Sequence, residues 1–273
     1  MRAEVCACLV CDKCDGTGRL FYEDDQGRSF VKNCECLNFR RRVDLLSRAG
    51  LPSKYAKVEL ETYHPFDSSQ KKALSRARDF LADFKKGGSD FNHGLVFMGG
   101  PGVGKTHLCV AIVKSLILDL GVSCKFVDFF QLFGEIRQGY SEDRAEKSLI
   151  EPLIQSRVLV IDELAKGRRH SEWEQSILDE FISARYNAGN KVTLYTTNYL
   201  NQLPNGKKSK KDDQQDRVDF REREFQQSFS KETLLDRVGE RIYSRITESS
   251  DFIEIKGEDF RQGMQGSSRR IRK

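Results

Sequence analysis

Residues 94–106 read GLVFMGGPGVGKT, and this stretch decides the fold of the chain. The apolar residues 95–98 predict a buried strand, residues 99–104 a glycine-rich loop, and the apolar run 107–120 a helix. Strand, loop and helix in this order are the context in which the pattern G-x-x-x-x-G-K-[ST] indicates a phosphate-binding loop. Glycines allow backbone N–H groups to surround phosphate oxygens, and the helix start adds partial positive charge. The stretch therefore predicts a nucleotide-phosphate site.

Two side chains of this loop and a later pair of acids predict the magnesium chemistry. Lys105 can reach the outer phosphates, and the Thr106 hydroxyl can bind Mg²⁺. Residues 157–161 predict another buried strand, which ends in Asp162 and Glu163. That strand should place Asp162 near the magnesium ion and Glu163 where it can orient or deprotonate the attacking water. The residues that we expect to contact ATP or its magnesium are Gly99, Gly100, Pro101, Gly102, Val103, Gly104, Lys105, Thr106, His107 and Asp162.

Three further apolar runs complete a predicted sheet. Residues 123–129, 192–196 and 251–255 read as strands, and helical segments separate the runs. We therefore predict a three-layer α/β fold with five parallel strands and helices on both faces. Asn198 follows the fourth strand, at a tip that lies between the phosphate loop and the acids in this class of sheet. It is our candidate for a side chain that hydrogen-bonds the γ-phosphate or the attacking water.

Helix signals surround these strands. Asp67 or Ser68 can cap a helix that Gly87 and Gly88 end, and Ser171 with Glu174 forms a capping box for another helix, in which Trp173 is expected to pack. From residue 231, a spacing of four predicts one helix that continues through Gly239, with its apolar stripe at Leu234, Val238, Ile242 and Ile246 and with Arg241 and Arg245 beside it.

Cysteines crowd the amino-terminal part, where six of the eight precede residue 37. Cys11-x-x-Cys14 and Cys34-x-Cys36 flank residues 19–31, which read as a hairpin, so the two thiolate pairs can converge on a structural Zn²⁺. Backbone N–H groups at Gly16 and Gly18 can stabilise the thiolates. Two alternatives remain open: Cys6 and Cys8 can compete as ligands, or the cysteines form a redox-sensitive cluster without metal.

Composition bounds the remaining possibilities. The chain has 273 residues and a net charge of +5, from 46 basic and 41 acidic residues. All five excess charges lie in residues 261–273, so overall charge says nothing about nucleic acid. The chain contains no apolar run of the ~18 residues that a membrane span needs, and its start lacks a secretory signal, which predicts a cytoplasmic protein.

The domain organisation follows from these segments. We predict a cysteine-rich zinc module over residues 1–37, a linker over 38–66, an ATPase domain over 67–261 with a mobile charged insertion at 201–229, and a basic disordered tail over 262–273.

The motifs together resemble the AAA+ ATPases of the DnaC/IstB-like group, and most closely the bacterial replicative helicase loaders. GGPGVGKTHL is similar to their Walker A motif, VLVIDEL to Walker B, YTTN to sensor 1, VGERIYSRI to box VII, and GLPSKYAKVELETY to their lead-in. The resemblance implies that Arg245 is an arginine finger offered to a neighbouring ATP site and that Arg241 assists it. It also implies a helical insert over residues 131–155, where Arg137, Arg144 and Lys147 could meet single-stranded DNA. Only 18 residues follow the fifth strand, too few for the helical lid of a full-size AAA+ protein.

The function that this resemblance implies is an ATP-driven switch that self-associates, or is completed by a partner, and delivers a replicative DNA helicase onto single-stranded DNA. Two alternatives stand beside it. One is a transposition-helper ATPase of the same group, and the other is a zinc adaptor that nucleotide stabilises without turnover.

Overall fold

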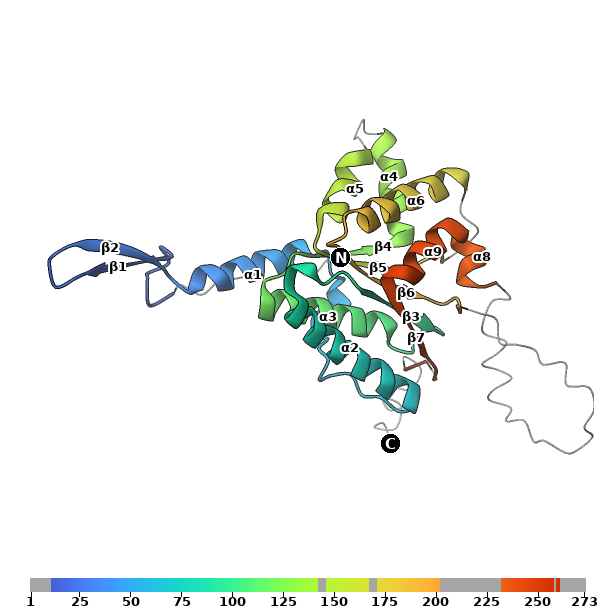
Figure 1. Ribbon diagram of the computed structural model, residues 1–273, viewed down its shortest axis with the longest axis horizontal. Coiled ribbons are helices and arrows are strands. Elements are labelled where there is room, and N and C mark those ends of the chain that lie inside the picture. Colours follow the sequence, from blue (N-terminus) through green and yellow to red (C-terminus); the bar gives the residue numbers. More distant parts are fainter. Residues whose placement is uncertain (1–10, 142–145, 167–170, 202–231, 258, 261–273) are drawn as a thin grey trace, which may run out of the picture.

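A small hairpin projects from the body of the protein at the end of a helix (Figure 1). The structure is a computed structural model and describes residues 11–141, 146–166, 171–201, 232–257 and 259–260. Strands β1 (Arg19–Glu23) and β2 (Ser29–Asn33) form the hairpin and pair antiparallel, and α1 (Cys36–Arg48) joins them to the body. The predicted hairpin is therefore confirmed.

Five parallel strands form the central sheet, as the sequence predicts. They are β3 (Gly94–Gly99), β4 (Cys124–Asp128), β5 (Val158–Asp162), β6 (Val192–Thr197) and β7 (Ser250–Ile255), in the order β4-β5-β6-β3-β7. Because β6 lies between β3 and β5, its carboxyl end lies between the phosphate loop and the acids at the end of β5. The topology thus brings the carboxyl ends of β3, β5 and β6 to the same edge of the sheet.

Helices cover both faces of the sheet (Figure 1). The helices α2 (Ser68–Gly87) and α3 (Lys105–Leu120) pack on one face with inward residues such as Leu95 and Phe97. The opposite face, with Val96 and Met98, packs against a second group of helices: α4 (Phe129–Ser141), α6 (Glu172–Asn187), α8 (Leu234–Val238) and α9 (Glu240–Ser249), together with part of α5 (Glu146–Gln155). Alternate residues of β3 therefore serve two cores, which explains why the whole strand is apolar.

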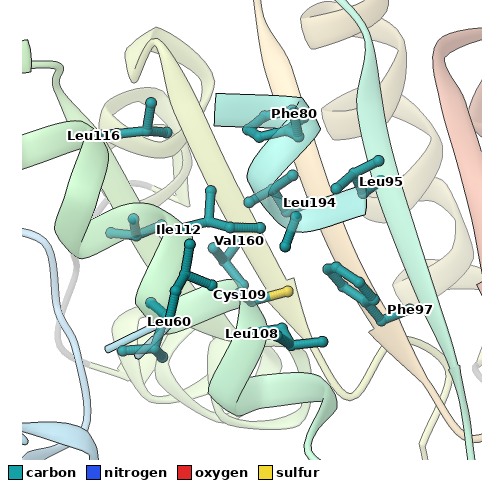
Figure 2. Packing of buried hydrophobic residues seen from close by; sticks show 14 of the residues in the cluster. Leu60, Phe80, Leu95, Phe97, Leu108, Cys109, Ile112, Leu116, Val160 and Leu194 are labelled. Carbon is teal, nitrogen blue, oxygen red and sulfur yellow. The ribbon is translucent and has the colours of Figure 1, made fainter. Parts of the chain in front are cut away.

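The core under α2 and α3 is dense with aliphatic and aromatic side chains. Figure 2 shows Phe80 of α2 and Leu108 and Ile112 of α3 in the same cluster as strand residues Phe97 and Leu194. All five side chains are buried, and burying a side chain of this size contributes roughly 1.5–3 kcal/mol. This packing fixes α3, and with it the phosphate loop, against the sheet.

The predicted helix starts are confirmed where the structure describes them. The side chain of Asp67 accepts a hydrogen bond from the Gln70 N–H and begins α2, and Ser171 and Glu174 form the capping box of α6. Short 3₁₀ turns occupy Ser53–Tyr55 and Gly88–Asp90. None of the helices in the described part of the chain combines the length and apolar character needed to span a bilayer.

The segment after α1 is part of the body rather than a simple tether. Leu51, Leu60 and Tyr63 are buried in the core under α2 and α3. The Lys114 ammonium of α3 donates hydrogen bonds to the carbonyls of Ala56 and Val58 at 2.9 and 2.7 Å. The glycine and proline breaks that suggest a linker thus serve to wrap this segment around α3.

Gly239 corrects one prediction, because the helix does not continue through it. The residue has φ 83° and ψ 159° and separates α8 from α9. Gly tolerates this positive φ, which a residue with a Cβ would resist. All four residues of the predicted apolar stripe are nevertheless buried: Leu234, Val238, Ile242 and Ile246. The predicted stripe is therefore confirmed, and only the prediction of one continuous helix is wrong.

Several predictions fall on residues outside the described part of the chain. They concern Cys6 and Cys8, Arg144, the charged segment 202–229 and the basic tail 262–273.

Candidate functional site

The phosphate loop leaves β3 at Gly99 and enters α3 at Lys105. Gly102 and Gly104 have φ values of 75° and 98°. A Cβ on Gly104 would lie 2.6 Å from the Tyr63 ring, and one on Gly102 would lie 1.8 Å from an oxygen of Asp259. Glycine is therefore required at both positions for backbone shape and for space.

Lys105 is folded back into its own loop. Its ammonium donates hydrogen bonds to the carbonyl oxygens of Gly99 at 2.8 Å and Gly100 at 2.6 Å, and the residue is only 8% exposed. The ammonium thus lies inside the curve of the loop. Phosphate oxygens bound there can replace the two carbonyl oxygens as its hydrogen-bond partners.

Thr106 connects the loop to the acids after β5. Its hydroxyl donates to a carboxylate oxygen of Asp162 at 2.8 Å. Neighbouring oxygen ligands of an octahedral Mg²⁺ at ~2.1 Å lie ~3 Å apart, so these two oxygens fit one magnesium ion as adjacent ligands. The residues that the sequence pairs across 56 positions therefore meet in space.

Asp162 is a buried carboxyl at the centre of this edge. Burial raises its pKa, the charges of Glu163 and Asp128 act in the same direction, and hydrogen bonds from Thr196 and Thr106 oppose the rise. A buried carboxylate of this kind gains from a nearby cation, because the cation offsets the lost hydration.

Thr196 is a functional candidate that sequence reasoning missed. Its hydroxyl donates to Asp162 at 2.6 Å and accepts the N–H of Glu163 at 2.9 Å. Asn198, the residue chosen from the sequence, lies just beyond the end of β6 and is exposed. The sequence signal for Thr196 is a hydroxyl residue near the carboxyl end of the strand beside β5. Deciding whether Thr196 or Asn198 faces Asp162 requires the register between β5 and β6.

Glu163 lies in a turn with unusual backbone geometry. Glu163 and Ala165 have φ values of 56° and 67°, although neither is glycine. The carboxylate of Glu163 forms an ion pair with Lys166, three residues along. The ion-pairing partner of the predicted base is therefore a residue of its own turn.

Arg245 and Arg241 lie on α9 away from the phosphate loop. Both guanidinium groups contact Asp179 of α6, Arg245 at 2.8 Å and Arg241 at 3.2 Å. Arg245 is the more sheltered of the two, with a side chain 20% exposed against 74% for Arg241. The structure does not bring either arginine to the phosphate loop of the same chain.

His107 faces the segment after α1. Its Nε2 lies 3.0 Å from the Glu59 carbonyl and 3.3 Å from the Thr62 hydroxyl, and its ring meets Tyr63 edge-on. Burial lowers the pKa of His107. These contacts hold His107 against the segment after α1.

The helical insert carries one of the predicted DNA-contact residues in an ion pair. Arg137 of α4 pairs with Glu174 of α6 and lies 5.7 Å from the Trp173 ring centre. Trp173 itself packs against Phe133, as predicted. Lys147 is exposed on α5.

Four cysteines at the base of the hairpin form a candidate metal centre. The sulfur atoms of Cys11 and Cys34 are 3.7 Å apart, those of Cys14 and Cys36 are 3.5 Å apart, and all four lie within 4.8 Å of one another. A tetrahedral Zn²⁺ with Zn–S bonds of ~2.3 Å needs sulfur separations of ~3.8 Å. The cluster therefore fits zinc.

The backbone around this cluster favours a thiolate. Gly18 donates its N–H to the sulfur of Cys14 at 3.3 Å. Burial opposes ionisation of Cys14, but this N–H and the neighbouring thiols lower its pKa to about 7. Burial and the neighbouring thiols raise the pKa of Cys36 to about 12. The Gly18 N–H thus favours the ionised form of Cys14.

The chain is similar to known ATP-binding and replication proteins. Residues 39–202 match the family described as IstB-like ATP binding protein. The replicative helicase loader DnaC of Buchnera aphidicola subsp. Baizongia pistaciae is 27% identical over 172 residues, which is 61% of this chain and 66% of DnaC. The Bacillus subtilis protein YqaM, itself uncharacterised, is 24% identical over 164 residues, covering 58% of this chain and 51% of YqaM. The chain thus spans between about half and two thirds of these curated relatives.

The fold has a solved counterpart. A crystal structure of the DnaC helicase loader superposes with a TM-score of 0.57 and 31% identity, covering 75% of this chain and all of that one.

Proposed function

Because the chain belongs to the family of IstB-like ATP binding proteins, we propose that it binds ATP with Mg²⁺ at residues 99–106 and hydrolyses it. The observation that carries this proposal is the contact between Thr106 and Asp162, to which Thr196 adds a second hydrogen bond. A glycine turn that binds no nucleotide does not require a hydrogen bond between the start of the following helix and a buried acid on a non-adjacent strand.

The proposed roles follow the geometry of the edge. Lys105 exchanges its two carbonyl partners for phosphate oxygens, and the backbone N–H groups of the loop surround them. Thr106 and Asp162 would hold Mg²⁺, which would supply positive charge beside the phosphates. Glu163 orients the attacking water and takes its proton, while Asn198 contacts the γ-phosphate or that water.

We further propose that hydrolysis drives the loading of a replicative DNA helicase onto single-stranded DNA. The support is the similarity to proteins named DnaC helicase loader, in sequence and in structure. The projecting hairpin module, stapled by zinc at Cys11, Cys14, Cys34 and Cys36, would act as the helicase-docking part. Residues 1–37, 38–66 and 67–261 would then serve as docking module, connection and motor.

The proposed ATP site is completed by a second molecule. Arg245 would reach the γ-phosphate of a neighbouring subunit or partner, with Arg241 beside it, because neither contacts the phosphate loop of its own chain. An arginine finger of this kind can contribute ~10³–10⁵ in rate.

A comparison of three proteins tests the enzymatic part. Nucleotide binding is measured with a fluorescent ATP analogue, and turnover by phosphate release, with full-length chains. Lys105→Ala should lose binding, and Glu163→Gln should bind but not turn over. Equal turnover by Glu163→Gln and the unchanged protein would disprove the hydrolytic role.

A capture experiment tests the loading part. Immobilised full-length protein with ATP is offered the purified replicative helicase of the same cell, with and without a single-stranded oligonucleotide. Helicase retention that depends on ATP supports loading. Retention of a transposase with duplex DNA, and not of the helicase, would favour the transposition-helper alternative.

A further inference from the structure

Lys166 is a residue that the proposed mechanism does not use, yet it contacts the base that the mechanism requires. Its ammonium forms an ion pair with the Glu163 carboxylate, with side chains 52% and 32% exposed. The Lys166 N–H also donates to the Glu163 carbonyl at 3.0 Å, which closes the turn. Lys166 and Glu163 therefore meet through both backbone and side chain.

The turn that brings them together is held from outside. Thr197 donates its hydroxyl to the Leu164 carbonyl at 3.0 Å, and buried Arg237 of α8 donates to the Ala165 carbonyl at 2.9 Å. Two non-glycine residues with positive φ persist only where the surroundings determine the backbone. The pairing of Lys166 with Glu163 is thus a consequence of a fixed turn.

Acidic groups around Lys166 favour its charged form. Hydrogen bonding to Glu163 raises the pKa of Lys166, and the charges of Glu163, Asp128 and Asp162 add to the rise. The lysine therefore stays protonated beside the acids that should serve magnesium and water. A general base has to lie within hydrogen-bond reach of the proton that it takes, whereas the contact with Lys166 directs one oxygen of the Glu163 carboxylate toward the ammonium.

We propose that Lys166 is a positioning residue that restrains Glu163 in the resting protein, and that hydrolysis accelerates when Lys166 leaves the carboxylate. The inference rests on the proposed hydrolytic role of Glu163. Because the ammonium is half exposed, a phosphate of single-stranded DNA can compete for it at little cost. The occupant that releases Glu163 is then a polyanion bound beside the turn.

The test compares Lys166→Ala, Lys166→Arg and the unchanged protein in basal ATP hydrolysis. Lys166→Ala should raise kcat up to about fivefold, as expected for an exposed ion pair, with KM for ATP unchanged. Lys166→Arg retains the ion pair and should keep the low basal rate. Oligothymidylate should stimulate Lys166→Ala by a smaller factor than the unchanged protein. Lys72→Ala, an exposed lysine of α2, is the matched control and should change nothing.

Two outcomes overturn the inference, and one separates it from the proposed function. A kcat for Lys166→Ala equal to or below that of the unchanged protein, with an unchanged melting temperature, shows that Lys166 does not restrain the base. Equal stimulation of both proteins by oligothymidylate shows that DNA does not act through Lys166. If Lys166→Ala is faster, the double variant with Glu163→Gln must be inactive; a fast double variant would instead show that hydrolysis does not use Glu163.

Discussion

The Asp179 carboxylate of α6 holds the Arg245 guanidinium of α9 at 2.8 Å. The second oxygen of the same carboxylate lies 3.2 Å from Arg241, so one acid serves both arginines. The proposed finger is therefore paired within its own chain, and a neighbouring triphosphate has to draw it away from Asp179.

Arg245→Ala should leave ATP binding intact and remove the hydrolysis that helicase and DNA stimulate, by at least tenfold. The variant also loses an ion pair, so its stability has to be measured beside its activity. Asp179→Asn is the matched control, because it weakens the same pair and keeps Arg245. It should show a similar small stability loss, about 1 kcal/mol or less, and near-normal stimulated turnover. Normal stimulated turnover by Arg245→Ala would rule out the trans-acting finger.

Thr196→Val should reduce turnover by about tenfold or more, because Asp162 and the Glu163 N–H both lose a hydrogen-bond partner. Leaving such buried groups unsatisfied costs about 1–3 kcal/mol. Thr193→Val, on the same strand, likewise removes a hydrogen-bond acceptor from a buried group, the Arg185 guanidinium at 3.0 Å, without touching Asp162 or the Glu163 turn. Steady-state hydrolysis and chemical denaturation of both variants separate the two effects. Equal turnover losses would mean that Thr196 acts only through the fold.

Zinc analysis of the full chain should find about one ion per molecule, and Cys34→Ser should lose it. Metal affinity supplies most of the folding free energy of so small a module, so hydrogen exchange over residues 11–36 should rise sharply in the variant. The thermal unfolding of the rest of the protein should change little, since the hairpin projects away from it (Figure 1). Unchanged exchange after chelation would show that the module folds without metal.

Asp251→Asn should destabilise the protein near neutral pH and by less near pH 3. Partial burial disfavours the ionised form, but hydrogen bonds from Arg76 at 2.6 Å and His93 at 3.0 Å hold the pKa of Asp251 below its ordinary value. A lowered carboxyl pKa contributes stability above the unfolded pKa of about 3.9, and this stability disappears as pH falls through the folded value. Denaturant unfolding at both pH values measures it, with Asp83→Asn as the control at the weaker contact of Arg76, 3.4 Å away. An equal loss at both pH values would contradict this origin.

The sequence by itself determined the sheet and the chemistry of its edge. Continuous apolar runs between helical patterns leave a parallel sheet covered on both faces as the consistent solution. The pattern at Lys105 and Thr106 and the acids at Asp162 and Glu163 predict a phosphate and magnesium site, because these residue types bind phosphate and Mg²⁺ in this loop pattern. The spacing of Cys11, Cys14, Cys34 and Cys36 likewise indicates a single tetrahedral centre, and their sulfur atoms converge as expected.

Only the tertiary structure decided which side chains share a hydrogen bond. Thr196 contacts Asp162 because the register pairs Ile161 with Tyr195, and no local pattern encodes that register. The pairing of Arg245 with Asp179 joins residues 66 positions apart on two helices, and the pairing of Lys166 with Glu163 requires a turn of positive φ that Thr197 and Arg237 enforce. Local sequence sets residue chemistry and helical or strand period, whereas such contacts depend on how distant elements pack.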